Sequence, residues 1–168
     1  MLLLRPAEPD DALPVARVHV RAWQAAYRKL LPDKYLDQLR PEDRAGRYDF
    51  GSTDIKKPHT VLAAENGIIL GFATTSPALE LEGLGEICAL YVDPGHWGCG
   101  IGVALVSAAR TRLFDLGFRN AVLWVLAGNV RAERFYQMDQ WMPNGLQRTV
   151  EMWGVKVDEL GYSRRLDS

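Results

Sequence analysis

The strongest constraint in this chain is a glycine-rich segment that follows an apolar run and precedes an amphipathic one. Residues 86–92 are typical of a central β-strand, which the Asp-Pro-Gly sequence at 93–95 ends. The segment His96-Trp97-Gly98-Cys99-Gly100-Ile101-Gly102 comes next. The apolar spacing beyond it predicts a helix that Gly117 can end in a left-handed conformation. The chain must therefore form a strand, a tight glycine turn and a helix in succession.

The turn at 96–102 is suited to binding an anion. The first N–H groups of a helix have no partner within the helix, and the helix dipole favours negative charge at that end. Glycines let a backbone approach phosphate oxygens closely and adopt positive φ. The sequence therefore predicts a phosphate-bearing ligand, and a tight connection without any ligand is the alternative.

Neither of the common nucleotide fingerprints fits this turn. A P-loop would need Lys and Ser or Thr after Gly100, where Ile101 and Gly102 stand. A dinucleotide-binding fingerprint that begins at Gly100 would need a glycine at position 105, which is Leu105. The ligand is therefore expected to be bound in another way.

Size and charge indicate one domain that spans residues 1–168. The 168 residues are 48% hydrophobic, which is enough for one core. Because 20 basic and 21 acidic side chains leave a net charge of −1, no overall field favours nucleic acid or an anionic membrane. We expect a cytoplasmic protein, since no signal-peptide core or membrane span is found. Cys88 and Cys99 are expected to be free thiols, and no Cys/His spacing predicts a metal.

Periodicity and turn residues predict the order strand, helices, three strands, helix, strand, helix and two strands, in an α/β (α+β) fold. A hairpin is expected around Glu65-Asn66-Gly67, because these residues separate two β-like runs. The expected strands are 2–5, 60–64, 68–75, 86–92, 121–126, 141–153 and 155–166. Helices are expected from residue 12 to about Leu31, as one or two short pieces within 33–50, after Gly102, and after Asn129.

Two segments resemble the signatures of the GNAT superfamily of N-acetyltransferases. Residues 90–94 and 97–102 are similar to its acyl-coenzyme A signature, Gln/Arg-x-x-Gly-x-Gly/Ala, although Trp97 replaces the Gln or Arg. Residues 123–136 resemble its second signature, which ends in Asn-x-x-Ala-x-x-Phe-Tyr. Gln140 stands where the family usually has glycine, so a positive φ there would strain or rebuild the turn. The element order agrees with the family over nearly the whole chain.

The resemblance implies a mixed, mostly antiparallel sheet of about seven strands, splayed between the fourth and fifth and flanked by about four helices. It also implies acetyl-coenzyme A as the acyl donor. The pyrophosphate would then bind the backbone amides of Trp97, Gly98, Cys99, Gly100, Ile101 and Gly102. The pantetheine arm would extend the sheet along the backbone of Leu90, Tyr91 and Val92. Asn129 is a helix cap by itself and, by resemblance, also contacts the pantetheine amides.

Acyl transfer to an amine needs a way to remove one proton and to supply another. Tyr136 matches the family's general acid, which protonates the departing thiolate; the alternative is a core aromatic whose hydroxyl has a backbone partner. Glu86 stands where some members have their general base, and a solvated or salt-bridged edge residue is the alternative. Glu80, Glu82 or a chain of waters could replace it. Cys99 has no predicted base partner, so direct attack by the amine in a ternary complex is preferred.

The acceptor site is expected between the first helix, residues 33–50 and residues 77–85. Trp23 and Tyr27 are candidates for its aromatic wall, although their helical spacing also fits the core. His19 and His59 are expected to be structural. The acceptor would be the primary amine of a small molecule or of a protein N-terminus. The closing strand at 155–166 could present an edge or an apolar face to a second copy in a homodimer.

Two other functions remain open at this point. The first is a non-catalytic acyl-coenzyme A binding or sensor module, in which Tyr136 and Glu86 are only structural. The second is a nucleotide-dependent, kinase-like protein, which the missing lysine after the glycine turn disfavours. Binding without turnover would indicate the sensor, and stabilisation by ATP instead of coenzyme A would indicate the kinase-like protein.

Overall fold

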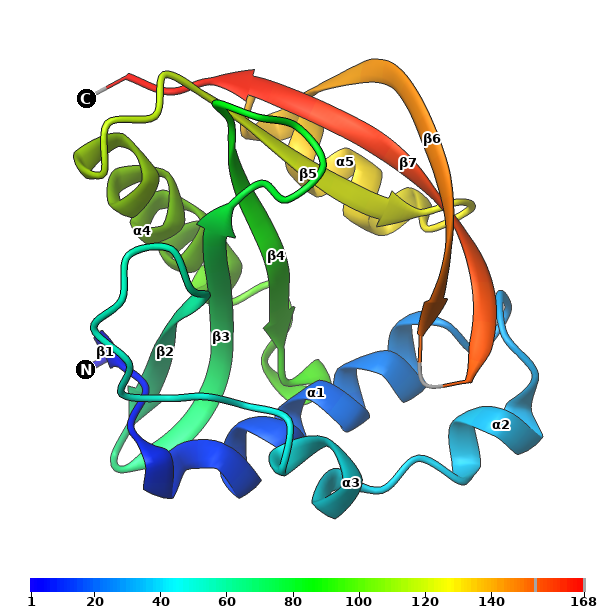
Figure 1. Ribbon diagram of the computed structural model, residues 1–168. Coiled ribbons are helices and arrows are strands. Elements are labelled where there is room, and N and C mark those ends of the chain that lie inside the picture. The colour runs from blue at the N-terminus through cyan, green and yellow to red at the C-terminus, as the bar shows by residue number, and fades with distance from the viewer. Residues whose placement is uncertain (153, 168) are drawn as a thin grey trace.

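The computed structural model describes residues 1–152 and 154–167, which form an open sheet of seven strands in the order β1-β2-β3-β4-β5-β7-β6 (Figure 1). Only the β4/β5 pair is parallel among these neighbours. The strands are β1 (Leu3–Pro6), β2 (His59–Glu65), β3 (Ile68–Pro77), β4 (Gly85–Val92), β5 (Asn120–Leu126), β6 (Met142–Met152) and β7 (Val155–Arg165). The helices are α1 (Ala12–Ala26), α2 (Asp33–Asp37), α3 (Pro41–Ala45), α4 (Ile101–Asp115) and α5 (Val130–Met138), with short 3-10 turns η1 (Pro9–Asp11) and η2 (Pro94–His96).

Helices cover both faces of the sheet because its central strands bury side chains on both sides. On β2, Ala63 packs in one cluster with α4 residues such as Leu105, whereas its neighbour Leu62 packs in another with Val15 of α1. This alternation follows from the two-residue period of a strand. No helix in the described residues is both long and apolar enough to cross a membrane.

The sheet opens between β4 and β5. The two strands are paired only from Gly85 with Ala121 to Ile87 with Leu123, although β4 continues to Val92 and β5 to Leu126. A register irregularity also interrupts the β3/β4 pairing beside Thr74 and Thr75. The predicted class of fold, the order of its elements along the chain and the splay between the fourth and fifth strands are therefore confirmed.

The first helix is shorter than the sequence predicts. It ends at Ala26, and Tyr27 leaves helical geometry with φ −112° and ψ 13°. The amides of Leu30 and Leu31 then bond to the carbonyl of Tyr27, so a tight turn replaces the last expected turn of helix. This bend lets Leu30 and Leu31 join the cluster that contains Tyr27. The sixth strand was predicted to reach Trp153, which lies outside the described residues.

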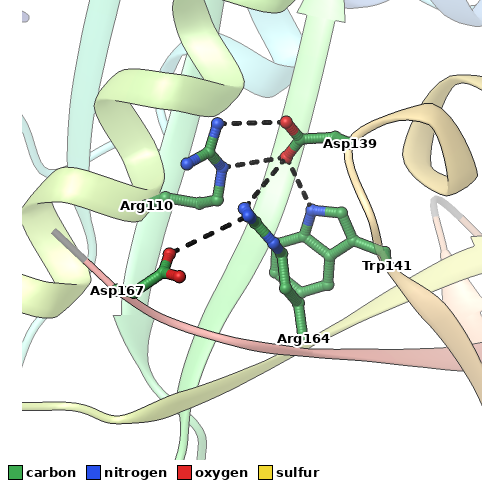
Figure 2. Close-up of polar contacts among 5 residues, drawn as sticks. All are labelled: Arg110, Asp139, Trp141, Arg164 and Asp167. Carbon is green, nitrogen blue, oxygen red and sulfur yellow. Dashed lines mark hydrogen bonds and ion pairs between the residues drawn. The ribbon is translucent and has the colours of Figure 1, made fainter.

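The turn after α5 keeps the positive φ that glycine usually adopts there, so of the two expected outcomes the strained turn is the one observed. Gln140 has φ +70°. The Asp139 carboxylate accepts hydrogen bonds from Arg110 Nε at 2.9 Å and Nη2 at 3.0 Å, and from Trp141 Nε1 at 2.9 Å (Figure 2). Arg164 lies 3.8 Å from the same carboxylate. These contacts hold the chain at a position where the backbone itself disfavours a side chain.

Candidate active site

A cleft of about 920 Å³ lies where β4 and β5 part. One wall is the unpaired end of β4, and the other is formed by β5 and α5. The glycine turn lines the cleft on the α4 face of the sheet, and the C-terminal half of α1 lines it on the opposite face, so these two segments mark its two ends. The splay of the sheet, which the resemblance implies, therefore coincides with a large cleft.

The glycine turn presents an open helix start to this cleft. Gly98 has φ +77° and Gly100, the residue before α4, has φ +84°. A Cβ atom at either position would meet no other atom within 4 Å, so positive φ and not crowding requires glycine there. Gly102 is different, because its Cβ would lie 3.1 Å from the Phe135 ring. The first turn of α4 therefore offers unpaired amides beside open space, which is the geometry that a phosphate needs.

Trp97 connects this turn to the end of β4 through a side-chain hydrogen bond. Its indole Nε1 donates to the carbonyl oxygen of Val92 at 2.8 Å. The guanidinium of Arg131, on α5, lies 3.5 Å from the centre of the Trp97 ring. Arg131 also lines the cleft, so a cation stands beside the glycine turn although the family's usual Gln or Arg is missing.

Asn129 and Tyr136 lie on the same wall of the cleft, at the start and toward the end of α5. The side-chain oxygen of Asn129 accepts from the amide of Ala132 at 3.2 Å, which confirms its predicted role as a helix cap. Tyr136 is only 9% exposed and packs edge-on against Phe135 and Trp141. Burial raises the pKa of Tyr136 well above its ordinary value of 10, so its hydroxyl keeps its proton.

Glu86 is placed near the cleft but is not among the residues that line it. It lies at the paired end of β4, opposite Val122 of β5 and Ser76 of β3. Burial raises the pKa of its carboxyl, and the nearby Arg148 partly offsets that effect. A carboxylate with a raised pKa is a better proton acceptor than an exposed one, so the environment suits a base.

Three predicted donor-binding residues of β4 line the cleft, namely Leu90, Tyr91 and Val92. The cleft is also lined by Trp97, Gly98, Gly100, Ile101 and Gly102. Cys99 is exposed and does not line it. The fit of coenzyme A to these residues rests on the open amides of α4 and on β4, whose edge toward β5 is unpaired beyond Ile87. An extended amide-containing arm can hydrogen-bond along such an edge.

Trp23 and Tyr27 are both core residues and cleft residues. They are 2% and 7% exposed, and both line the cleft where the C-terminal end of α1 borders it. Trp23 Nε1 donates to the hydroxyl of Tyr91 at 3.0 Å, and the Tyr27 ring packs edge-on against Trp23. The two alternatives considered for these residues are therefore compatible.

The other segments expected at the acceptor site do not line the cleft. The helices within residues 33–50 pack against α1, and the Tyr35 hydroxyl of α2 donates to the carbonyl of Met152 at 3.1 Å. The loop 78–84 joins β3 and β4 at the paired end of β4. The α1 end of the cleft is lined instead by Met152 of β6 and Glu159 of β7. His19 is buried and bonded through Nδ1 to the Tyr48 hydroxyl at 2.9 Å, which fits the structural role expected of it.

Glu159 is the site residue that sequence reasoning missed. It is 5% exposed, it lines the cleft, and its Oε1 accepts from Arg148 Nε at 2.8 Å. The available signal was its phase, because Glu159 lies two residues from Val157 and two from Gly161 and therefore shares their buried face of β7. An acid at an inward position of a strand is a candidate site residue. Among the described residues, no three His, Cys, Asp or Glu side chains gather as metal ligands would.

The fold, the cleft and the glycine turn are those of an acyltransferase of the GNAT type. The chain belongs to the acetyltransferase (GNAT) family, whose profile matches residues 21–139. It is 30% identical over 164 residues to an uncharacterised N-acetyltransferase, YuaI, of Bacillus subtilis, covering 96% of this chain and 91% of that protein.

Solved structures show the same fold. The PaiA N-acetyltransferase from Thermoplasma acidophilum, in complex with coenzyme A, superposes with a TM-score of 0.73 at 16% identity, over 98% of this chain and 99% of that one. The ribosomal-protein-S18-alanine N-acetyltransferase from Escherichia coli gives a TM-score of 0.71 at 18% identity, over 100% of this chain and 96% of that one.

Proposed function

We propose that this protein transfers an acetyl group from acetyl-coenzyme A to a primary amine of a small molecule or a protein N-terminus, by direct attack in a ternary complex. The observation that carries the proposal is the shared cleft, in which the open amides of α4, the unpaired edge of β4 and the Tyr136 hydroxyl face one space. Acetyl-coenzyme A would supply an acyl group activated as a thioester.

The chain's residues bind and orient this donor in two places. The amides of Gly100 to Gly102 hold the pyrophosphate at the start of α4, and Arg131 adds a positive charge beside them. The backbone of Leu90, Tyr91 and Val92 hydrogen-bonds the pantetheine arm. The same backbone amides stabilise negative charge that develops on the thioester oxygen, an effect worth roughly 3 kcal/mol for each donor.

The amine nitrogen forms the new C–N bond as the C–S bond breaks. Glu86, directly or through water, accepts the proton that the ammonium must lose, because its carboxyl is half-buried and its pKa is raised. Tyr136 donates a proton or a hydrogen bond to the departing sulfur, because it is protonated and lines the cleft. The nitrogen loses two protons in all: Glu86 accepts the first, and the second, which leaves the nitrogen after the C–N bond has formed, restores the proton that Tyr136 gives to the sulfur.

The proposal is tested by release of free thiol from acetyl-coenzyme A in the presence of a panel of amines and peptide N-termini. The expected result is amine-dependent thiol release together with a product heavier by one acetyl group. Calorimetry with desulfo-coenzyme A measures donor binding separately. Binding without turnover on every acceptor would contradict the proposal and favour a sensor module.

The acceptor differs between relatives of this fold. The Escherichia coli neighbour is named for an alanine of a ribosomal protein, which is a protein acceptor. The name of YuaI gives no acceptor. The acceptor of this chain is therefore best inferred from its own cleft.

A further inference from the structure

The charged side chains that line the cleft are separated by sign along its length. The basic residues belong to the glycine-turn end, since His96 is part of η2, Arg131 lies over Trp97, and Arg134 follows Arg131 by one turn of α5. Glu159 lies opposite Leu126 in the β5/β7 pairing and close enough to Tyr27 to affect its pKa, so it lines the α1 end, where Trp23 and Tyr27 also lie. In the part of the chain that the structure describes, it is the one acidic side chain that lines the cleft.

Glu159 keeps an unused hydrogen-bond acceptor. Arg148 Nε donates to Oε1 at 2.8 Å, and no described residue donates to Oε2. Because a carboxylate has two oxygens that each accept more than one hydrogen bond, an N–H donor in the cleft can bind the second oxygen. The residue is 5% exposed, and a buried carboxylate gains strongly from such a donor.

Arg148 does not neutralise this end of the cleft. Its guanidinium also lies 3.5 Å from Glu80 and 4.2 Å from the centre of the Trp124 ring. Arg148 is also close enough to Glu86 to lower the pKa of that carboxyl. Three carboxylates therefore surround one guanidinium. Arg148 itself is not among the residues that line the cleft, so it is turned to its protein partners.

We infer that Glu159 binds the ammonium group of the acceptor, and that the acceptor is a primary amine without a carboxylate next to its amino group. This inference rests on the proposed function. An acceptor carboxylate would approach Glu159 with no described basic side chain lining this end to offset the repulsion. The rings of Trp23 and Tyr27 suit the apolar carbons of an alkyl or aryl amine, and an aromatic face also attracts an ammonium.

Matched pairs of amine and parent amino acid test the inference: tyramine with tyrosine, tryptamine with tryptophan, and agmatine with arginine. We expect kcat/KM for acetyl transfer to be at least tenfold higher for the amine of a pair. In Glu159→Gln, the KM for the preferred amine should rise at least tenfold and the preference within the pair should shrink. Glu151→Gln is the control, because Glu151 is an exposed acid on the same hairpin.

Calorimetry keeps the inference testable apart from turnover. Tyramine and tyrosine are titrated into the protein saturated with coenzyme A, and only tyramine should bind, with loss of binding in Glu159→Gln. If Glu159→Gln unfolds because Arg148 loses its partner, Glu159→Gln with Arg148→Gln removes both charges of the pair. Equal use or binding of amines and amino acids, binding of neither, or an unchanged KM in Glu159→Gln would overturn the inference. Absence of thiol release with selective tyramine binding would contradict only the proposed function.

Discussion

Arg131 and Trp97, from two different elements, form one unit, with the guanidinium 3.5 Å from the centre of the indole ring. The indole is itself fixed by the hydrogen bond from its Nε1 to the carbonyl of Val92. A tryptophan in the glycine turn thus replaces the polar side chain that is usual in the family, and it holds a cation from α5 at the same place. The positive charge beside the glycine turn is therefore supplied by α5.

Replacing Arg131 should therefore weaken donor binding. We expect Arg131→Met to raise the Kd for coenzyme A about tenfold, because a hydrogen bond to a charged phosphate is worth roughly 1.5–3 kcal/mol. Isothermal calorimetry measures this change. Arg119→Met removes an equal charge from a guanidinium that lies over Phe114 instead, and it should leave the Kd unchanged. Equal effects of the two variants would show that only net charge matters.

Tyr136→Phe removes a single hydroxyl from the cleft wall. We expect kcat to fall roughly 100-fold, the lower end of general-acid effects, because a phenol with a raised pKa is a weak acid toward a thiolate whose conjugate acid has a pKa of about 8.5. Affinity for coenzyme A should not change. Tyr162→Phe is the matched control, since that buried hydroxyl donates to Glu133 and does not line the cleft. Unchanged kcat in Tyr136→Phe would leave only a packing role.

The pH dependence of kcat/KM tests Glu86. An alkyl ammonium with a pKa of about 10.4 gives log(kcat/KM) a slope of one against pH throughout the range below that pKa. Because burial raises the pKa of Glu86 above its usual 4.5, the slope should increase from one to two as the pH falls through that raised value and the base becomes protonated. Glu86→Gln should lower the rate and keep a slope of one. A wild-type slope that stays at one, with folding verified by circular dichroism, would exclude Glu86 as the base.

The parts of the site that follow from local sequence could be predicted, and the parts that depend on packing could not. The glycine turn is local, because positive φ at Gly98 and Gly100 and the helix that follows are specified within a few residues. Arg131 lies inside a recognised motif, but its position over Trp97 depends on how α5 packs against the turn. Glu159 lies 33 residues beyond Leu126, the nearest cleft residue of β5, and only the β5/β7 pairing, which places these two residues opposite each other, brings them to one cleft. The early end of α1 similarly results from packing of Leu30 and Leu31 with Tyr27.

His19 should make stability depend on pH near neutrality. Burial among Trp23, Tyr48, Phe72 and Tyr91 lowers its pKa well below the usual 6.5. The unfolded chain then binds a proton more readily than the folded one. The free energy of unfolding therefore has its full value above pH 6.5, and it falls by up to about 1.4 kcal/mol for each pH unit below 6.5. Urea unfolding at pH 7.5 and 5.5 should show this loss, and His19→Gln should reduce it. His59→Gln should have a smaller effect, because His59 is only partly buried.

Gln140→Gly should stabilise the fold, because Gln140 adopts φ +70° at the turn that Asp139 holds (Figure 2). The left-handed region costs an L-residue roughly 1–2 kcal/mol, and glycine avoids that cost but loses more backbone entropy on folding, so the expected net gain is about 0.5–1 kcal/mol. Urea unfolding measures the gain, and kcat should not change because Gln140 does not line the cleft. Ser107→Gly, at an exposed position within α4, should destabilise the protein instead, since the residue there has helical geometry. Destabilisation by Gln140→Gly would mean that the side chain of Gln140 adds more to the free energy of unfolding than the positive φ takes from it.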